Sequence, residues 1–441
     1  MVMEMSNVGA MSDIIDRARR SIAPSQSNCE MDFVLSKAKG TVLEDIQGKR
    51  YLDFFSGIAV CNVGHCHPKV AGAIKAQVDK SLHACLSGYF FLQQPMIALA
   101  EKLKEIGPLK EGKVFFCSSG ADTVEGGLKV ARLYSKKLGI ISYMGSFHGR
   151  TLGATSVTAS NSKYRRLQTP LLGGVTHVPF PYCYRCAFGK EYPDCDVFCF
   201  GFIDRTLESV MFPEDVAAVL IEPIQGEAGY VPPPDEYMHR LRKLCTDRGF
   251  LLMMDEIQTG FGRTGKMFAC EHTNTVPDIM LMSKAIAAGL PLGAIVARPE
   301  IMDTFIPHTH AGTFNGNPIC CSAALASIEV IQGERLVENA AKVGSFIMKR
   351  LGEMQDKIPV IGDIRGKGLM VGVELVEDKK SKKPLVEESR KITPEAAKRG
   401  LALITTGVYG HVVRIAPALV LTEQEADRGL HIIEEVLKEL K

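Results

Sequence analysis

The sequence has no excess of charge of either sign and no long hydrophobic run. Its 52 Lys and Arg residues are balanced by 50 Asp and Glu residues, which leaves a formal net charge of +2. A nearly neutral chain offers no electrostatic attraction for nucleic acid or an anionic membrane, so we expect neither as a partner. The longest apolar stretch, 285–297, is interrupted by Gly289, Pro291 and Gly293 and falls short of the roughly 18 residues that span a membrane.

The N-terminus lacks the apolar segment of an export signal. Acidic residues stand at Glu4, Asp13 and Asp16, so we expect a cytoplasmic protein. In such a protein the 13 cysteines are expected to be reduced thiols, and several of them lie in apolar segments. Neither an internal repeat nor a low-complexity tract is visible.

What the sequence does contain is an ordinary globular composition, 46% hydrophobic and 23% charged, which excludes a disordered or fibrous chain. Apolar runs typical of strands alternate with helical patterns in the middle of the chain. The expected strands are 113–117, 139–143, 217–222, 250–255, 278–282 and 293–297, and the expected helices include 123–137, 235–245 and 317–332. Strands that are apolar throughout, with helices between them, predict an α/β fold with a mostly parallel sheet covered on both faces.

The C-terminal part of the sequence has a different pattern. Short strands are expected at 369–375 and 412–416, and a closing helix begins at Thr422, where Thr422 and Glu425 form a capping box. We interpret this part as a second, smaller α+β domain that packs with the first residues of the chain. The expected domains are a large one, 62–330, and a small one, 1–61 with 331–441.

Two charged residues stand where buried strands end, which is where ligands of parallel sheets bind. Asp255 closes the strand 250–255 and needs a cationic partner or hydrogen-bond donors there; a helix cap or a structural ion pair is the alternative interpretation. Lys284 follows the strand 278–282 and precedes small apolar residues, so desolvation lowers its pKa and favours a nucleophilic amine. An amine and a carboxylate from neighbouring strands are what pyridoxal phosphate requires.

Two further strand ends add weaker signals. Gly120 and Ala121 follow the strand 113–117 at the start of a helix, where free N–H groups can bind a phosphate, although many such turns look alike. Phe147 and His148 follow the strand 139–143 and could stack on a flat cofactor. A lone ring of this kind more often packs in a core, so the argument depends on all these strand ends together.

The sequence resembles class-III aminotransferases of pyridoxal-phosphate fold type I, most of all 4-aminobutyrate aminotransferases. The resemblance covers nearly the whole chain and depends on the motifs SSGADTVEGGLK, SFHGRT, IEPIQGEAGY, MMDEIQTGFGRTG, DIMLMSKAI and GTFNGNP. It implies a large cofactor-binding domain with a mostly parallel sheet, a smaller α+β domain and the cofactor pyridoxal 5'-phosphate. Asp122 stands where the family usually has Glu, which affects a capping carboxylate and not the lysine chemistry.

The resemblance also implies roles for cofactor-binding residues. Lys284 is the catalytic Schiff-base lysine and proton shuttle, and Asp255 pairs with the pyridine nitrogen. Thr313 reaches the phosphate of a neighbouring subunit, so a homodimer with sites at the subunit interface is expected, alone or within a tetramer. The remaining cofactor residues are Gln258 near the ring hydroxyl, Gly120 and Ala121 at the phosphate, Phe147 stacked on the ring with His148 beside it, and Glu222 at the end of a buried strand.

On the substrate side, the resemblance implies that Arg414 binds an α-carboxylate bidentately and Arg150 a distal carboxylate, while Ile58 lines the pocket. Glu227 pairs with Arg414 while an ω-amine reacts and releases it for 2-oxoglutarate. The alternative for Glu227 is a residue that only braces its turn. The expected reaction is transfer of an amino group from an ω-amino acid such as 4-aminobutyrate to 2-oxoglutarate, giving a semialdehyde and glutamate.

Other functions remain open at this point. An amino acid racemase or epimerase of the same fold would use the same lysine, and ornithine- or lysine-type donors would fit the same pocket. A non-catalytic member is disfavoured by the intact Lys284, Asp255 and Gln258. The cysteines Cys183, Cys186, Cys195 and Cys199 have spacings that can hold zinc, but we expect free or occasionally oxidised thiols and no metal.

Overall fold

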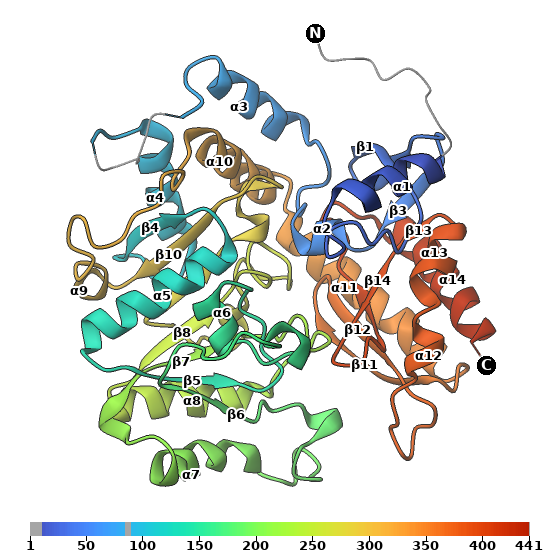
Figure 1. The fold of residues 1–441 in the computed structure, drawn as a ribbon. Coiled ribbons are helices and arrows are strands. Elements are labelled where there is room, and N and C mark those ends of the chain that lie inside the picture. Colours follow the sequence, from blue (N-terminus) through green and yellow to red (C-terminus); the bar gives the residue numbers. More distant parts are fainter. Residues whose placement is uncertain (1–10, 84–89, 441) are drawn as a thin grey trace.

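The computed structural model describes residues 11–83 and 90–440. A seven-stranded sheet forms its larger part, with the strand order β4-β10-β9-β8-β7-β5-β6 (Figure 1). Its strands are β4 (Lys113–Cys117), β5 (Gly139–Tyr143), β6 (Val175–Val178), β7 (Val216–Ile221), β8 (Leu251–Asp255), β9 (Ile279–Met282) and β10 (Gly293–Ala297). Only β10 runs antiparallel to its neighbours, which confirms the mostly parallel sheet expected from the sequence.

Helices cover both faces of this sheet, as successive residues of β8 illustrate. Leu251 and Met253 pack in the same cluster as helix α5 (Gly120–Ser135). Leu252 and Met254 point to the opposite face and pack in the cluster that includes helix α8 (Asp235–Arg248). A strand buried on both faces has no polar alternation, which explains the continuous apolar runs in the sequence.

A second, four-stranded sheet has the order β11-β12-β15-β14. Its strands are β11 (Ile361–Lys367), β12 (Met370–Leu375), β14 (Ile404–Thr406) and β15 (Val412–Ile415). Helices α11 (Leu336–Gln355) and α14 (Glu423–Glu439) pack against each other beside it. The capping box of Thr422 and Glu425 at the start of α14 is confirmed by reciprocal hydrogen bonds.

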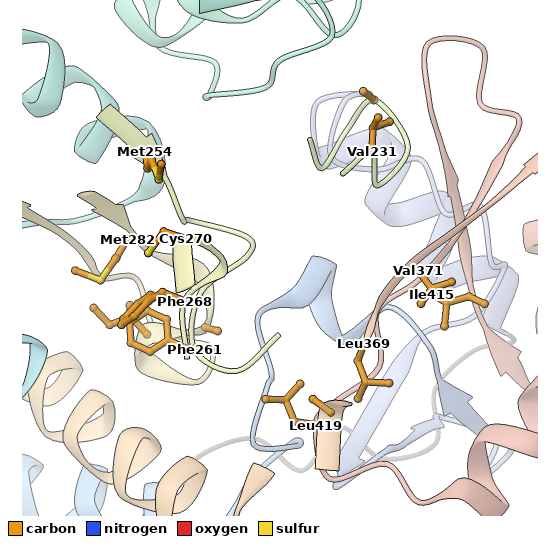
Figure 2. Packing of buried hydrophobic residues seen from close by; sticks show 14 of the residues in the cluster. Val231, Met254, Phe261, Phe268, Cys270, Met282, Leu369, Val371, Ile415 and Leu419 are labelled. Carbon is orange, nitrogen blue, oxygen red and sulfur yellow. The ribbon is translucent and has the colours of Figure 1, made fainter. Parts of the chain in front are cut away.

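A third sheet joins the two ends of the chain. The strands β1 (Leu35–Lys39), β2 (Val42–Asp45) and β3 (Arg50–Asp53) are followed in space by β13 (Leu401–Ala402), which runs parallel to β3. The N-terminal elements in blue therefore lie beside the C-terminal elements in red (Figure 1). The second sheet and its flanking segments contribute side chains to the main hydrophobic core. Among them are Leu369, Val371, Ile415 and Leu419 (Figure 2).

The remaining helices are mostly short or peripheral. They are α1 (Met11–Ser21), α2 (Ser56–Ala59), α3 (Pro68–Val78), α4 (Gln94–Ile106), α6 (Leu152–Val157), α7 (Gly201–Ser209), α9 (Pro299–Met302), α10 (Pro318–Gly333), α12 (Val386–Ser389) and α13 (Ile392–Lys398). Within the described residues, none of the helices is both long and apolar enough to cross a membrane.

Seven strands and one helix start of the described residues differ from the sequence-based expectation. The strands that were not expected are β1, β2, β3, β6, β11, β13 and β14, and α5 begins at Gly120 instead of at residue 123. The earlier start has a local cause, because the side chain of Ser119 accepts a hydrogen bond from the N–H of Asp122 and caps the helix.

Candidate active site

Three parallel strands bring three charged side chains to one edge of the large sheet. Glu222 follows β7, Asp255 ends β8 and Lys284 comes two residues after β9. The strands β7, β8 and β9 are direct neighbours and parallel, so their carboxyl ends meet. The structure thus brings together the residues that the sequence placed at successive strand ends.

Lys284 provides the amine of this group. It begins a short 3-10 turn, Lys284–Ala287, and its φ of 45° lies in the left-handed region that a lysine rarely adopts. The pKa of Lys284 is lowered to about 8, mainly by burial and also by the cation of Arg414, while the carboxylates Asp255, Glu222 and Glu227 oppose the shift. A substantial fraction of neutral amine is therefore present near neutrality, as nucleophilic chemistry requires.

Asp255 is buried and oriented by two donors. Its side chain is paired with His148, at 2.7 Å between Oδ2 and Nδ1, and its Oδ1 accepts a hydrogen bond from the N–H of Ile257 at 3.0 Å. The far nitrogen of His148, Nε2, is buried without a hydrogen-bond partner among the described residues. Asp255 is thus a buried carboxylate with both oxygens held by other groups of the chain.

Glu222 connects two turns at the edge of the sheet. Its carboxylate accepts hydrogen bonds from the N–H of Phe147 at 2.8 Å and from the N–H of Gly226 at 2.9 Å. Burial raises the pKa of Glu222 to about 7; nearby His148 lowers it and Asp255 raises it. Glu222 therefore fixes the position of Phe147 in the site.

Gln258 lies against the same turn. A Cβ atom at Gly226 would come within 2.7 Å of Gln258 Nε2, so only glycine leaves room for this amide. Gln258 Oε1 is buried and has no hydrogen-bond partner within the described part of the chain. An amide oxygen left without a partner in this way indicates that a donor from a bound molecule belongs there.

The start of helix α5 offers backbone N–H groups to the site. Gly120 and Ala121 are its first two residues, and Asp122 accepts a hydrogen bond from the N–H of Ser118 at 2.8 Å. A Cβ atom at Gly120 would lie 3.2 Å from Ile257 and 3.6 Å from Ser283, so the helix start is packed closely against the segments that carry Asp255 and Lys284. The carboxylate of Asp122 thus satisfies a backbone N–H group just before the helix.

Arg414 lies on β15, so the second sheet contributes a side chain to the site. It is 2% exposed, and its NH2 group donates to Glu227 Oε2 at 2.9 Å and to Thr406 Oγ1 at 2.7 Å. Its guanidinium lies over the ring of Tyr230, at 5.3 Å from the ring centroid. Burial by itself favours the neutral form of Glu227, but the charge and hydrogen bond of Arg414 lower its pKa below the usual range.

A second arginine lies on the other side of Glu227. Tyr164 donates its hydroxyl to Glu227 Oε1 at 3.0 Å, and its ring is 4.8 Å from the Arg150 guanidinium. The same guanidinium is 4.9 Å from the ring of Phe147, so two aromatic rings hold it in place. A polar cavity of about 550 Å³ opens beside Glu227 and is also lined by Thr406.

Two expected residues have no such contacts. Ile58 is 42% exposed and has a φ of 65°, within a run of left-handed residues at the end of the third sheet. Thr313 is exposed, in a loop before helix α10.

A family model for class-III aminotransferases matches residues 23–437. The chain belongs to the class-III aminotransferase family. It is 42% identical to the leucine/methionine racemase of Thermococcus litoralis (97% of this chain, 96% of the relative) and 38% identical to a probable 4-aminobutyrate aminotransferase of Bacillus subtilis (91% and 92%). The PLP-bound amine transaminase of an uncultivated Pseudomonas species is similar in structure, with a TM-score of 0.89 and 31% identity (96% and 97%).

Pyridoxal 5'-phosphate is the cofactor of this class-III aminotransferase, and the site fits it. The neutral amine of Lys284 suits its carbonyl, the fixed carboxylate of Asp255 suits a protonated ring nitrogen, and the unpartnered oxygen of Gln258 suits its ring hydroxyl. The N–H groups at Gly120 and Ala121 suit its phosphate.

Sequence reasoning missed three residues that the structure adds to the site. Tyr164 bridges Glu227 and Arg150, while Thr406 and Tyr230 contact Arg414. No spacing in the sequence points to Tyr164 or Thr406. Tyr230 stands within the quoted motif IEPIQGEAGY, so that motif could have indicated it.

Proposed function

We propose that this protein transfers the amino group of an ω-amino acid such as 4-aminobutyrate to 2-oxoglutarate, giving a semialdehyde and glutamate. The observation that carries the proposal is the ion pair of Arg414 and Glu227. An ω-amine donor has no α-carboxylate, and without a partner the buried Arg414 would then be an uncompensated charge. Glu227 supplies that partner from within the chain.

The same pair can open for the second substrate. The Glu227 side chain is 31% exposed and borders the polar cavity, so it has space to turn away from Arg414. Arg414 Nε is buried and has no hydrogen-bond partner among the described residues, so the guanidinium keeps a donor for an incoming α-carboxylate. Arginine favours such two-point binding of a carboxylate because its donors form a planar fork.

Arg150 receives the distal carboxylate in this proposal. It makes no ion pair with any acidic side chain of the described residues, and the rings of Phe147 and Tyr164 hold its guanidinium. A cation that is held in place without a carboxylate is suited to bind one from a ligand. Both 4-aminobutyrate and 2-oxoglutarate carry a carboxylate remote from the reacting carbon.

The bound cofactor acts as an electron sink at the substrate carbon. Lys284 Nζ would accept the proton from that carbon and deliver it to the cofactor, which the lowered pKa of its amine allows. Asp255, oriented by His148 and by the N–H of Ile257, would supply the negative charge that keeps the ring nitrogen protonated. Phe147, fixed through Glu222, covers the site on one side.

The test is an assay of the purified holoenzyme with a panel of amino donors and 2-oxoglutarate. We expect glutamate to form with 4-aminobutyrate or a close ω-amine, such as an ornithine- or lysine-type donor. Circular dichroism of single amino acid enantiomers is measured in parallel. If no ω-amine yields glutamate while an enantiomer loses its optical signal, the aminotransferase proposal is wrong.

A second candidate function is racemisation or epimerisation of amino acids. It is favoured by the relative from Thermococcus litoralis, a leucine/methionine racemase with higher identity than the probable 4-aminobutyrate aminotransferase. A racemase would use Lys284 to move the same proton but would need no second substrate. Arg414 would then bind the α-carboxylate of every substrate, and the pairing with Glu227 would compete with each of them.

We further propose a homodimer with its active sites at the subunit interface, alone or within a tetramer, in the cytoplasm. The exposed loop with Thr313 supports this, together with the neighbouring Phe314, which is 63% exposed. We also propose the division into a large cofactor-binding domain, 62–330, and a small domain, 1–61 with 331–441. Light scattering of the holoenzyme tests the assembly.

A further inference from the structure

Four cysteines line one small cavity in the segment that follows β6. They are Cys183, Cys186, Cys195 and Cys199, and aromatic side chains complete the lining. The cavity measures about 20 Å³, which is room for one water molecule. Because a space of that size takes neither a substrate nor a cofactor, the chemistry available there is that of the thiols themselves.

The thiols lie close enough to influence one another. Burial raises the pKa of Cys183 to about 11, and Cys195 and then Cys186 add to the shift. Burial likewise raises the pKa of Cys199 to about 12, with contributions from the other three thiols. Cys183 is exposed whereas its three neighbours are only partly so, which makes Cys183 the thiol that a reagent in solvent reaches first.

The arrangement favours a bond between two sulfurs over a shared metal ion. Among the described residues, no three side chains of His, Cys, Asp or Glu are arranged to hold a metal. Cys195 lines the same cavity of about 20 Å³ as Cys183, so the exposed thiol has a neighbouring thiol to pair with. We propose that Cys183 and Cys195 form a reversible dithiol–disulfide pair, a site of oxidative modification separate from the active site.

The oxidant in this proposal is a low-molecular-weight disulfide. The Cys183 thiolate attacks one of its sulfur atoms, forms a mixed disulfide and releases one thiolate. The Cys195 thiolate then attacks Cys183 Sγ, forms the internal disulfide and releases the second thiolate. Two protein thiols are oxidised, the reagent is reduced to two thiols, and the two cysteine protons pass to the released thiolates. The raised pKa of Cys183 makes the exchange slow near neutrality and faster as pH rises toward 11.

The segment that carries the pair is fastened to the second sheet. Tyr182 and Arg185 both hydrogen-bond to Glu374 of β12, whose side chain has no exposed surface. Strand β12 pairs with β15, where Gly372 lies opposite Arg414. A covalent link from Cys183 to Cys195 therefore closes a loop immediately beside a contact that joins the two sheets, and we expect it to stabilise the folded protein.

The test treats the holoenzyme with 2-hydroxyethyl disulfide at alkaline pH, followed by alkylation and peptide mapping by mass spectrometry. We expect a peptide pair that joins Cys183 to Cys195, lighter by two hydrogens, and a higher melting temperature that a reducing agent reverses. Cys195→Ser should abolish both effects. The matched control is Cys66→Ser, which removes an exposed thiol outside the cluster and should leave both effects intact.

Three results would overturn the proposal. One is full alkylation of Cys183 and Cys195 after treatment, and another is a Cys195→Ser protein that still shows the melting-temperature shift. The third comes from elemental analysis of the same sample: about one zinc per chain, with the thiols protected until chelation, would identify a metal centre instead.

Discussion

His148 Nδ1 lies 2.7 Å from Asp255 Oδ2, and both side chains are almost fully buried. The two residues come from different strand ends, β5 and β8, and the imidazole therefore fixes one oxygen of the carboxylate from the side. The N–H of Ile257 fixes the other oxygen. The direction of this carboxylate is thus set by the protein before any ligand arrives, which is the preorganisation that electrostatic catalysis requires.

Asp255→Asn should retain cofactor binding but lose most of the activity. An amide has nearly the shape of the carboxylate but carries no charge, so it does not keep the ring nitrogen protonated. We expect kcat to fall by about 10²–10³-fold, the range for loss of one preorganised electrostatic group. Steady-state kinetics and cofactor absorbance measure the two effects, and a variant with kcat near that of the wild type would make Asp255 a structural residue.

Lys284→Ala should abolish turnover while the protein remains folded. The substitution removes the amine that moves the proton. It also removes a charge whose burial is unfavourable, which offsets the lost attraction to Asp255, Glu222 and Glu227. We expect a loss of at least about 10²–10⁴-fold in kcat. Borohydride reduction of the wild-type holoenzyme should attach the cofactor to Lys284, and a mass shift on another lysine would refute the assignment.

Glu227→Ala should impair the half-reaction with the ω-amine more than the half-reaction with glutamate. Loss of the partner leaves Arg414 buried and unpaired when the donor lacks an α-carboxylate, at a cost of up to about 3–5 kcal/mol. Part of that cost should appear in kcat/KM for the ω-amine, with a shift toward α-amino donors.

The measurement for Glu227 is single-turnover kinetics of each half-reaction. Glu227→Gln is the matched control, since it keeps the side-chain length and a hydrogen-bond acceptor but removes the charge. Equal slowing of both half-reactions in Glu227→Ala would mean that Glu227 only supports its turn, and the racemase candidate would then gain support.

The amine of Lys284 should titrate near pH 8 in the cofactor-free protein. Its pKa in the folded state, about 8, lies below the ordinary value of 10.5, so the unfolded chain binds more protons between these two values. The free energy of unfolding should therefore rise as pH increases from about 8 to 10.5, by linkage.

The measurement is acetylation of Lys284, followed by mass spectrometry, which should increase with a midpoint near pH 8. Arg414→Leu should move the midpoint upward, because the Arg414 cation lowers this pKa; an unchanged midpoint would contradict that.

The candidate site residues that were predicted from the sequence were predictable for one physical reason. Asp255 and Lys284 stand immediately after strands of unbroken apolar character, and parallel topology alone brings such strand ends together. The order β9-β8-β7 then makes their meeting unavoidable. A charged residue at the end of an apolar run can be recognised from neighbouring residues in the sequence. A single sequence is therefore enough to predict it as a site residue.

The residues that were missed depend on contacts between distant segments. Tyr164 ends a 3-10 helix of three residues, Ser162–Tyr164, and its role depends on Glu227 and Arg150, which flank it in space. Thr406 ends β14, a strand of three residues that is too short for a periodic signal. Their roles follow from how the second sheet packs against the first, and no spacing in the sequence encodes that packing.

The parallel pairing of β3 with β13 has a consequence for synthesis of the chain on the ribosome. Leu52 pairs with Leu401 and Asp53 with Ala402. The edge of β3 therefore stays unpaired until β13, close to the C-terminus, has left the ribosome. During translation β1, β2 and β3 can form only an incomplete sheet with an open edge, and pairings between such distant segments are slow to form. We expect truncated chains that end before residue 401 to leave this edge exposed and to aggregate, whereas chains extended past it can seal the sheet.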